Sequence, residues 1–460
     1  MNGRLSDMVT LLGATLRGSD SDYAGASIDT RRLTRGALFF ALPGARVDGH
    51  DFVARAASLG AAAAVVTHEV DSPLPQIVVD DVEAALQQAG AEARRSFNGA
   101  VIGVTGSNGK TTVKQMLAAI LAEAGSVLAT EGNLNNHLGV PLTLMRVNDS
   151  INRAVIEMGA SHAGEIAMLA EMARPQVGVV TNAGLAHIEG FGSREGVARA
   201  KGEMFSNLPA DGTAVINGDD EFAPLWQELA GERRRLVFAR GQADNVDVFA
   251  SDEALDADES RFTLHTPTGS AVVTLPLAGS HNVSNALAAA AAASAIDLDA
   301  DLIARALGGM RSVAGRMAVT AGRHGARIID DSYNANPGSL AAALGWLAQQ
   351  DGTRWAALGD MAELGEMAEQ AHRDAGRAAR DAGIERLWTT GELSRLTAEA
   401  FGPGAQWFST HGELIAALET ALSVRRSETM LLIKGSRSAR MDRIADALAA
   451  EAGAKAGASC

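Results

Sequence analysis

A glycine-rich turn followed by lysine and threonine is the segment of this chain whose residues could do the clearest chemistry. Residues 100–104 are apolar and typical of a buried strand, and a helical pattern runs over about 110–122. Where a strand leads through such a turn into a helix, backbone N–H groups at the helix start can bind phosphate oxygens. Gly106 and Gly109 allow the backbone to approach a ligand closely. The segment therefore predicts a nucleoside triphosphate site.

Two side chains at the start of this helix add to the predicted site. Lys110 brings a positive charge to the terminal phosphates, and the hydroxyl of Thr111 can ligate Mg²⁺. The spacing departs from the general G-x-x-x-x-G-K-[ST] pattern, because Val104 stands where that pattern needs glycine. The alternative is a glycine turn beside an ordinary surface lysine. The strand and the helix on either side of the turn favour the phosphate site.

Other chemically capable side chains also follow predicted strands, and in a parallel sheet ligands bind beyond the carboxyl ends of the strands. Glu157 closes an apolar strand, where an unpaired buried carboxylate is unstable. A metal ion would stabilise it, and an ion pair or an edge position is the alternative. His187 lies on a glycine-rich loop after the next strand, where it is a candidate metal ligand or a structural side chain.

The remaining candidates are ambiguous when taken singly. Lys201 lies in a helical pattern, where a solvated side chain is the simplest interpretation. Asn282 and Asn285 open a helix, and their amides suit an adenine edge; the alternative is N-capping of the helix by Ser280 or Asn282. Polar residues after two strands of the last third indicate either ligand-facing loops or solvated turns: Asp330, Asp331, Tyr333, Asn334, Asn336, Lys434, Ser436 and Arg437.

The elements that must position these residues fall into three blocks of an α/β fold. Residues 1–98 combine short strands with two helices, and residues 99–313 start with the phosphate strand and include a long alanine-rich helix. Residues 314–460 alternate strand and helix regularly, which predicts a parallel sheet. The acidic segment 251–261 is predicted to be a surface hairpin or loop.

Length and composition limit the classes of function. A chain of 460 residues is too long for one core, and a net charge of −15 argues against nucleic acid or an anionic membrane as the main partner. The only cysteine is Cys460, so no internal disulfide or cysteine-based metal site is expected. No segment has the length and apolar character of a signal peptide or a membrane span. We expect a soluble cytoplasmic monomer.

Taken together, the motifs are similar to those of the Mur ligase family, which are ATP-dependent amide-forming enzymes of peptidoglycan synthesis. The matching segments span nearly the whole chain in order: SIDTRRL, TGSNGKTT, GNLNNHLGVPLTL, IEMGASHAGEI, TNAGLAHIEGFGS, AKGEMF, GSHNVSNALAA, DDSYNANPGS, LGDMAELGEMAEQAH and IKGSRSARM. The glycine spacing of TGSNGKTT is the family's own form. The resemblance implies an N-terminal UDP-substrate domain (1–98), a central P-loop mononucleotide-binding domain with a parallel sheet (99–313), and a C-terminal Rossmann-like domain (314–460).

The same resemblance implies roles for individual residues. ATP would be held by Gly106, Ser107, Asn108, Gly109, Lys110, Thr111, Thr112, Asn282, Asn285, Arg316, Asp331, Asn334 and Asn336. One Mg²⁺ would lie at Thr111 and Glu157. A second would lie at His187 and Lys201, with a carbamate on the lysine. The other substrates would contact Ser27, Thr30, Arg31, Asn135, Asn136, Lys434, Ser436 and Arg437.

Three motifs, GNLNN, SYNANP and KGSRS, indicate one branch of the family. Its substrates are UDP-N-acetylmuramoyl-tripeptide and D-alanyl-D-alanine, joined through an acyl phosphate with release of ADP and phosphate. A ligase that adds the third peptide residue and a folylpolyglutamate synthetase have similar architectures and remain alternatives. A regulatory NTPase switch that binds a protein is an alternative of a different class, but dense polar loops in two blocks favour an enzyme. The third residue of the tripeptide, meso-diaminopimelate or lysine, stays open.

Overall fold

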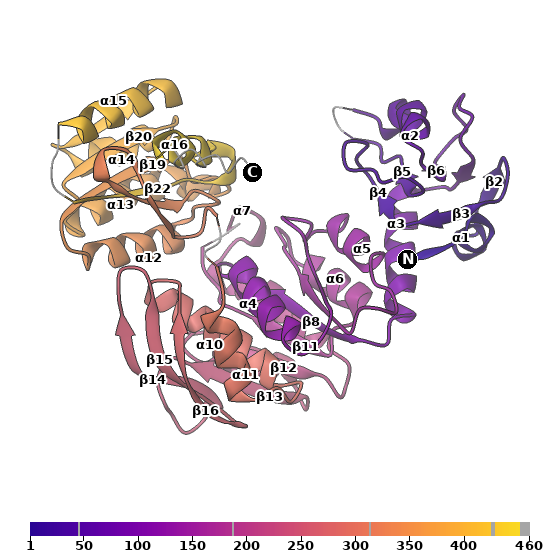
Figure 1. The fold of residues 1–460 in the computed structure, drawn as a ribbon, viewed down its shortest axis with the longest axis horizontal. Coiled ribbons are helices and arrows are strands. Elements are labelled where there is room, and N and C mark those ends of the chain that lie inside the picture. The colour runs from indigo at the N-terminus through magenta and orange to yellow at the C-terminus, as the bar shows by residue number, and fades with distance from the viewer. Residues whose placement is uncertain (45–46, 186–187, 312–313, 425–427, 451–460) are drawn as a thin grey trace, which may run out of the picture.

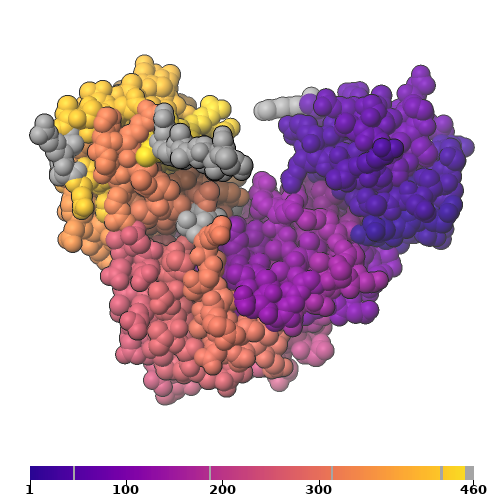
Figure 2. Space-filling view, in the orientation of Figure 1, coloured from indigo at the N-terminus to yellow at the C-terminus, as the bar shows by residue number. Residues whose placement is uncertain are grey.

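The computed structural model describes residues 1–44, 47–185, 188–311, 314–424 and 428–450. It contains three main sheets, one in each of the blocks expected from the sequence, and one separate antiparallel pair of strands. Figure 1 shows the central block at the base, with the N-terminal and C-terminal blocks above it on opposite sides. Figure 2 shows that the surface is hollowed between these two upper blocks. The residue boundaries 98/99 and 313/314 stay predictions.

The N-terminal block is built on a five-stranded sheet in the order β2-β7-β6-β5-β4, in which only β2 runs antiparallel to its neighbour. The strands are β2 (Thr15–Arg17), β4 (Ala26–Ser27), β5 (Leu38–Phe40), β6 (Ala63–Val66) and β7 (Gln76–Val78), and β1 (Asn2–Arg4) pairs with β3 (Asp22–Ala24). The helices are α1 (Leu5–Leu12), η1 (Gly49–Phe52), α2 (Val53–Ser58) and α3 (Val82–Arg95).

The central block holds a nine-stranded sheet in the order β16-β15-β14-β13-β12-β11-β8-β10-β9. The strands β8 to β14 are parallel, and β15 and β16 add an antiparallel edge. The strands are β8 (Ala100–Thr105), β9 (Val127–Ala129), β10 (Arg153–Glu157), β11 (Val177–Val180), β12 (Thr213–Asn217), β13 (Arg234–Ala239), β14 (Val248–Leu255), β15 (Ser260–Thr266) and β16 (Gly269–Leu275). The helices are α4 (Lys110–Ala122), α5 (Gly139–Leu144), α6 (Glu165–Ala173), α7 (Ile188–Phe191), α8 (Arg194–Ser206), α9 (Ala223–Ala230), α10 (Ser280–Ser294) and α11 (Ala300–Gly308).

The C-terminal block has six strands in the order β17-β18-β22-β19-β20-β21, and only β17 is antiparallel. The strands are β17 (Ala318–Ala321), β18 (Arg327–Asp331), β19 (Thr353–Gly359), β20 (Arg386–Thr390), β21 (Ala405–Phe408) and β22 (Thr429–Lys434). The helices are η2 (Arg323–Gly325), α12 (Pro337–Ala348), η3 (Gly365–Met367), α13 (Ala368–Asp381), α14 (Ser394–Phe401), α15 (His411–Ser423), η4 (Arg437–Ala439) and α16 (Asp442–Leu448). Apolar clusters cover both faces of the sheet.

Small side chains allow close packing within the central block and between it and the N-terminal block. The alanine run 288–293 of α10 is fully buried, so this helix packs closely on α4 and on the central sheet, as expected from its composition. In α3, Gly90 lies against α5, and a Cβ atom at this position would lie 2.5 Å from the Cβ of Pro141. One continuous apolar cluster therefore runs from Phe40 in the N-terminal sheet to Ile156 in the central sheet.

Two registers bring predicted site residues together at strand ends. In the central sheet, Glu157 at the end of β10 is paired with Val104 of β8, next to the start of the glycine turn. In the C-terminal sheet, Asp331 at the end of β18 is paired with Lys434 at the end of β22. The acidic segment 251–261 forms part of the β14–β15 hairpin. None of the helices in the described part of the chain has the length and apolar character that a bilayer crossing requires.

Candidate active site

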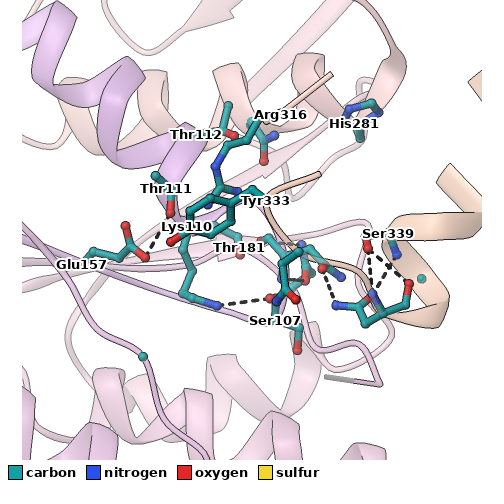
Figure 3. Close-up of a pocket in the computed structure, with 18 of the residues that line it drawn as sticks. Ser107, Lys110, Thr111, Thr112, Glu157, Thr181, His281, Arg316, Tyr333 and Ser339 are labelled. Atoms are coloured by element: carbon teal, nitrogen blue, oxygen red, sulfur yellow. Dashed lines mark hydrogen bonds between the residues drawn. The ribbon is translucent and has the colours of Figure 1, made fainter. Parts of the chain in front are cut away.

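A cavity of about 830 Å³ lies where the central and C-terminal blocks meet, and Figure 3 shows it from close by. It is lined by strand ends and helix starts of both blocks, which are far apart in the sequence. The predicted site residues that line it are Ser107, Asn108, Gly109, Lys110, Thr111, Thr112, Asn135, Asn136, Glu157, Asn282, Asn285, Arg316, Asp331, Asn334, Asn336, Lys434, Ser436 and Arg437.

The glycine turn between β8 and α4 is held in one shape by neighbouring strands. Gly106 has φ 142°, and a Cβ atom there would lie 1.9 Å from the hydroxyl of Thr181. Gly109 has φ 82°, so both positions favour glycine. Asn108 donates its backbone N–H to Asn182 Oδ1 at 2.9 Å and accepts the Thr181 hydroxyl at 2.6 Å. The loop is therefore preorganised at the start of α4, as a phosphate site requires.

The ammonium of Lys110 folds over this loop. Its Nζ donates to the carbonyl oxygens of Gly106 at 2.6 Å and Ser107 at 3.1 Å. Burial lowers the pKa of Lys110, the nearby Glu157 carboxylate raises it, and Arg316 lowers it further. Lys110 thus brings its charge to the loop without a carboxylate within ion-pair distance among the described residues.

Glu157 is buried at the end of β10, with 2% of its surface exposed. Its Oε1 accepts hydrogen bonds from the Thr111 hydroxyl at 3.1 Å and from Asn135 Nδ2 at 2.8 Å. Its Oε2 lies 3.3 Å from Lys114 Nζ. The ion pair named as an alternative to a metal is therefore present, and no feature of the sequence indicated that Lys114 would supply it. Asn135, predicted to contact substrate, has Glu157 as its partner.

The pair of Thr111 and Glu157 fits a magnesium ion. Mg²⁺ binds oxygen ligands and is commonly held by one or two carboxylates together with substrate phosphates. Oε2 of Glu157 accepts no hydrogen bond from the described residues, so it keeps a lone pair for a cation. No cluster of three or more His, Cys, Asp or Glu side chains suited to a metal occurs within the described residues. His187, predicted as a ligand of a second ion, lies outside those residues.

Lys201 lies on α8 behind the cavity wall, 1% exposed, and does not line the cavity itself. Its Nζ donates to the carbonyl of Ala160 at 3.0 Å and lies 5.0 Å from the centre of the Phe191 ring. Burial, followed by the charge of Lys110, lowers the pKa of Lys201 to about 7, although Glu165 and Glu203 raise it. The solvated alternative for this lysine is wrong, because its amine is removed from water.

Two asparagines of α10 face the glycine turn. Asn282 donates to the carbonyl of Ala278 at 2.8 Å and accepts from Asn285 Nδ2 at 3.2 Å. Asn285 Oδ1 packs on Gly109, where a Cβ atom would lie only 2.3 Å away. Asn282 makes no capping bond at the start of α10. Their place in the cavity keeps the predicted adenine contact open.

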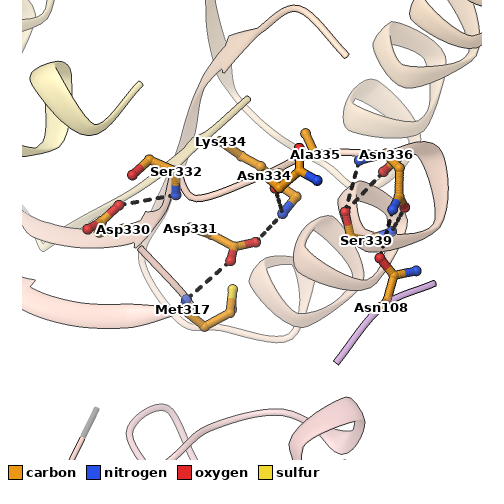
Figure 4. A network of polar contacts seen from close by, with 10 residues as sticks. All are labelled: Asn108, Met317, Asp330, Asp331, Ser332, Asn334, Ala335, Asn336, Ser339 and Lys434. Carbon is orange, nitrogen blue, oxygen red and sulfur yellow. Dashed lines mark hydrogen bonds and ion pairs between the residues drawn. The ribbon is translucent and has the colours of Figure 1, made fainter. Parts of the chain in front are cut away.

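The loop after β18 carries the polar run of the C-terminal block, shown in Figure 4. Asp331 forms an ion pair with Lys434 at 2.5 Å and accepts the backbone N–H of Met317 at 3.2 Å. Lys434 also donates to the carbonyl of Asn334 at 2.9 Å. The side chains at the ends of β18 and β22, which were predicted to face a ligand, thus interact with each other.

Asn336 joins the two blocks at the phosphate loop. Its Oδ1 accepts the backbone N–H of Ser339 at 2.9 Å, which caps α12. Its Nδ2 donates to Oδ1 of Asn108 at 2.7 Å across a sequence separation of 228 residues (Figure 4). This direct contact supports the predicted placement of the loop over the nucleotide site.

Two arginines flank the ring of Tyr333 at the cavity. The guanidinium of Arg316 lies 4.1 Å from the ring centre and that of Arg437 lies 5.6 Å from it. Both distances suit cation–π contacts. Ser436 donates its hydroxyl to the carbonyl of Asp360 at 2.6 Å. No individual role was predicted for Tyr333, because the residues around a strand-end tyrosine do not identify its partners.

The cavity wall also includes the predicted residue Asn136 and several residues that were not predicted. Asn136 accepts the backbone N–H groups of Leu138 and Gly139 at the start of α5, so its carbonyl oxygen already has structural partners. Lining residues that were not predicted include His281, Phe238, Asn217, Ala362 and Glu363. His281 lies in the first turn of α10, and burial lowers its pKa, but these surroundings arise only in the fold.

The predicted UDP-substrate residues of the N-terminal block lie elsewhere. Ser27 and Thr30 are buried beside the five-stranded sheet, and neither they nor Arg31 line the cavity. Ser27 donates to the carbonyl of Asp29 at 2.9 Å, and Arg31 pairs with the same aspartate at 2.7 Å. The structure thus does not bring these three together with the phosphate loop, and their role stays a prediction.

Comparisons with known proteins agree with this architecture. Three segments match family descriptions: residues 22–123 the Mur ligase family catalytic domain, 104–293 the Mur ligase middle domain, and 315–437 the Mur ligase glutamate ligase domain. The UDP-N-acetylmuramoyl-tripeptide–D-alanyl-D-alanine ligase of Escherichia coli K12 is 43% identical over 96% of this chain and 98% of its own length.

Solved structures give the same result. A crystal structure of MurF from Acinetobacter baumannii has a TM-score of 0.89 and 34% identity, covering 95% of this chain and 97% of that chain. MurF ligase from Thermotoga maritima in complex with ADP has a TM-score of 0.79 and 28% identity, covering 92% of this chain and 96% of that chain. The α/β fold expected from the sequence is confirmed. This chain belongs to the Mur ligase family.

Proposed function

We propose that this chain is an ATP-dependent ligase that joins D-alanyl-D-alanine to UDP-N-acetylmuramoyl-tripeptide in the synthesis of peptidoglycan precursors, with release of ADP and phosphate. The observation that carries the proposal is the cavity in which a preorganised phosphate loop faces polar loops of the C-terminal block. The E. coli relative with this activity matches over nearly the full length of both chains. GNLNN, SYNANP and KGSRS support the same branch over the rival ligases.

The cavity residues have separate roles in the activation of the substrate carboxylate. The glycine turn and Lys110 bind the phosphates of ATP. Asn282 and Asn285 contact the adenine, and Thr111 and Glu157 would hold Mg²⁺. When bound, the ion neutralises charge on the phosphates and so permits a carboxylate to approach the γ-phosphate. Without such neutralisation, one pair of like unit charges at 4 Å costs about 4 kcal/mol at an effective dielectric of 20.

The reaction then proceeds on the substrates. The tripeptide carboxylate accepts the γ-phosphoryl group, which gives an acyl phosphate and ADP. The neutral amine of D-alanyl-D-alanine attacks the acyl carbon, and phosphate leaves. The C-terminal block contributes Arg316, Asp331, Asn334 and Asn336 over the nucleotide, and its closure excludes water from the acyl phosphate. Lys434, Ser436 and Arg437 contact the peptide substrates.

The finer assignments belong to the same proposal. His187 and a carbamylated Lys201 would hold a second Mg²⁺. The UDP-linked substrate contacts Ser27, Thr30 and Arg31 of the N-terminal domain, with Asn135 and Asn136 of the central domain. The domains are 1–98, 99–313 and 314–460. The enzyme works as a monomer in the cytoplasm, where ATP is available, and light scattering of the purified chain tests its mass.

A single assay tests the function. Purified protein with ATP and Mg²⁺ is given UDP-N-acetylmuramoyl-tripeptide, with and without D-alanyl-D-alanine, and nucleotide products and ligated peptide are measured. We expect one ADP and one amide product per turnover, only when both substrates are present. Ligation of free diamino acids or glutamate instead of the dipeptide would assign the chain to a rival branch. ATP hydrolysis that depends on a protein partner without ligation would favour the switch alternative.

A further inference from the structure

Lysine is rare in this chain. Of the 40 basic residues only five are lysines, at positions 110, 114, 201, 434 and 455, and all the others are arginines. Lysine presents a compact point charge, whereas arginine presents a wide planar fork. Lys110, Lys201 and Lys434 are already part of the proposed site. Lys114 is the remaining lysine within the described residues, and the proposed reaction gives it no role.

Lys114 lies one helical turn after Lys110 on α4, and 3% of its surface is exposed. Its Nζ donates to the carbonyl of Thr130 at 2.8 Å and lies 3.3 Å from Oε2 of Glu157. Glu157 is equally buried. Two opposite charges are thus held together away from water, and removing either one leaves an uncompensated buried charge.

The two oxygens of the Glu157 carboxylate have different partners. Oε1 accepts hydrogen bonds from Thr111 and Asn135, whereas Oε2 accepts none from the described residues and lies within ion-pair distance of the Lys114 ammonium. A divalent cation at this carboxylate must therefore share it with a fixed positive charge. The Thr130 carbonyl holds that charge in place.

We propose that Lys114 is an internal counter-ion of Glu157 that holds this carboxylate in position before the metal ion binds and lowers the affinity of the site for the ion. The proposal rests on the proposed function, because it takes Glu157 as a metal ligand. Lys114 is a positioning residue, since it acts through Glu157 and not on substrate. A nearby unit charge changes the affinity for a divalent ion about tenfold even in a water-like dielectric.

The experiment uses the full chain and needs no ligase substrate. The variants are Lys114→Met, Glu157→Gln, the double variant, and Arg94→Met as a matched control. Arg94 is a buried cation that donates to the carbonyls of Ala173, Phe97 and Arg174 and does not line the cavity. The midpoint of thermal unfolding is measured in chelator. Mn²⁺ binding in the presence of ADP is followed by the electron paramagnetic resonance signal of the free ion.

We expect Lys114→Met to lower the unfolding midpoint by several degrees in chelator and to bind Mn²⁺ about tenfold more tightly. The double variant should be more stable than Lys114→Met alone, because no buried charge is left over. Arg94→Met should lose stability without a change in Mn²⁺ affinity. If Lys114→Met does not fold, the same measurements are made on Lys114→Gln, because its amide can still donate a hydrogen bond to the Thr130 carbonyl.

Two results would overturn different parts of the proposal. Unchanged or weaker Mn²⁺ binding in the Lys114 variants, beside a wild-type protein that binds the ion, would refute the counter-ion role and leave the proposed function intact. A wild-type protein that binds no Mn²⁺, or a Glu157→Gln variant that binds it normally, would refute the metal site itself. Additive stability losses in the double variant would also refute the coupling of the two charges.

Discussion

The state of the Lys201 amine gives the sharpest test of the proposed second metal position. Burial and the charge of Lys110 lower the pKa of this amine from 10.5 to about 7. At pH 8 about nine-tenths of the amine would then be neutral, whereas an ordinary lysine would be neutral in fewer than about one molecule in a hundred. Only the neutral amine adds CO₂. An N–C bond forms, the amine proton passes to solvent, and an anionic carbamate replaces the cation.

The experiment removes either CO₂ from the solution or the amine of Lys201 from the protein. In ¹³C-bicarbonate, the wild-type protein should show one carbamate resonance that is absent from Lys201→Ala and that disappears at low pH or low bicarbonate. Lys201→Ala should lose activity by a factor of about 100 or more, as expected for a group that stabilises charge in the transition state. Short carboxylates should restore part of that activity. Lys201→Arg should stay inactive, because it cannot form the carbamate.

The stability of the protein should report the same shift in pKa. Between about pH 7 and pH 10.5 the unfolded chain binds a proton at this lysine and the folded chain does not, so stability rises with pH over this range. At about 1.4 kcal/mol per pKa unit, the rise amounts to at most about 5 kcal/mol. Lys201→Met should flatten it. A bare amine in fully active, CO₂-equilibrated protein, or full activity of Lys201→Arg, would refute the carbamate.

Three further predictions concern the nucleotide. Lys110→Ala and Glu157→Ala should each lower kcat by a factor of about 100 or more while circular dichroism shows an intact fold, and near-normal turnover of either at saturating Mg²⁺ would contradict its role. Asp331→Ala and Asn336→Ala should raise KM for ATP although they lie about two hundred residues from the loop, and unchanged ATP kinetics would mean that their loop serves another ligand. ADP and phosphate should form in equal amounts with the amide product, whereas AMP and pyrophosphate would indicate adenylation.

Much of the fold could be predicted because its signals are local. The helix at 110–122 begins and ends as expected, since its apolar periodicity lies within the segment itself. The strand ends at Asp331 and Lys434 could be expected to meet, because parallel strands bring their carboxyl ends to one edge. Polar side chains at the ends of strands therefore correctly indicated where the cavity lies.

The partners within the cavity could not be predicted, because they depend on packing between distant segments. Asn135 bonds to Glu157, and Lys114 pairs with the same carboxylate, but neither residue type specifies its partner. The sequence allowed a metal or an ion pair at Glu157 as alternatives, whereas the structure contains the ion pair beside a hydroxyl suited to a metal. A linear sequence pattern does not show which cation lies beside this carboxylate, because Lys114 and Glu157 meet only in the folded chain.

The contact between Asn108 and Asn336 bears on how the C-terminal domain can move. It joins two neutral amides at 2.7 Å, and such a hydrogen bond contributes about 1 kcal/mol net. A bond of this strength orients α12 toward the phosphate loop but is easily broken. The backbone of Asn108 also accepts a hydrogen bond from the Thr181 hydroxyl and donates one to Asn182 Oδ1. These two bonds hold the loop in shape without the bond to Asn336. The phosphate loop therefore does not depend on this contact for its shape, which the proposed closure of the C-terminal block over the nucleotide requires.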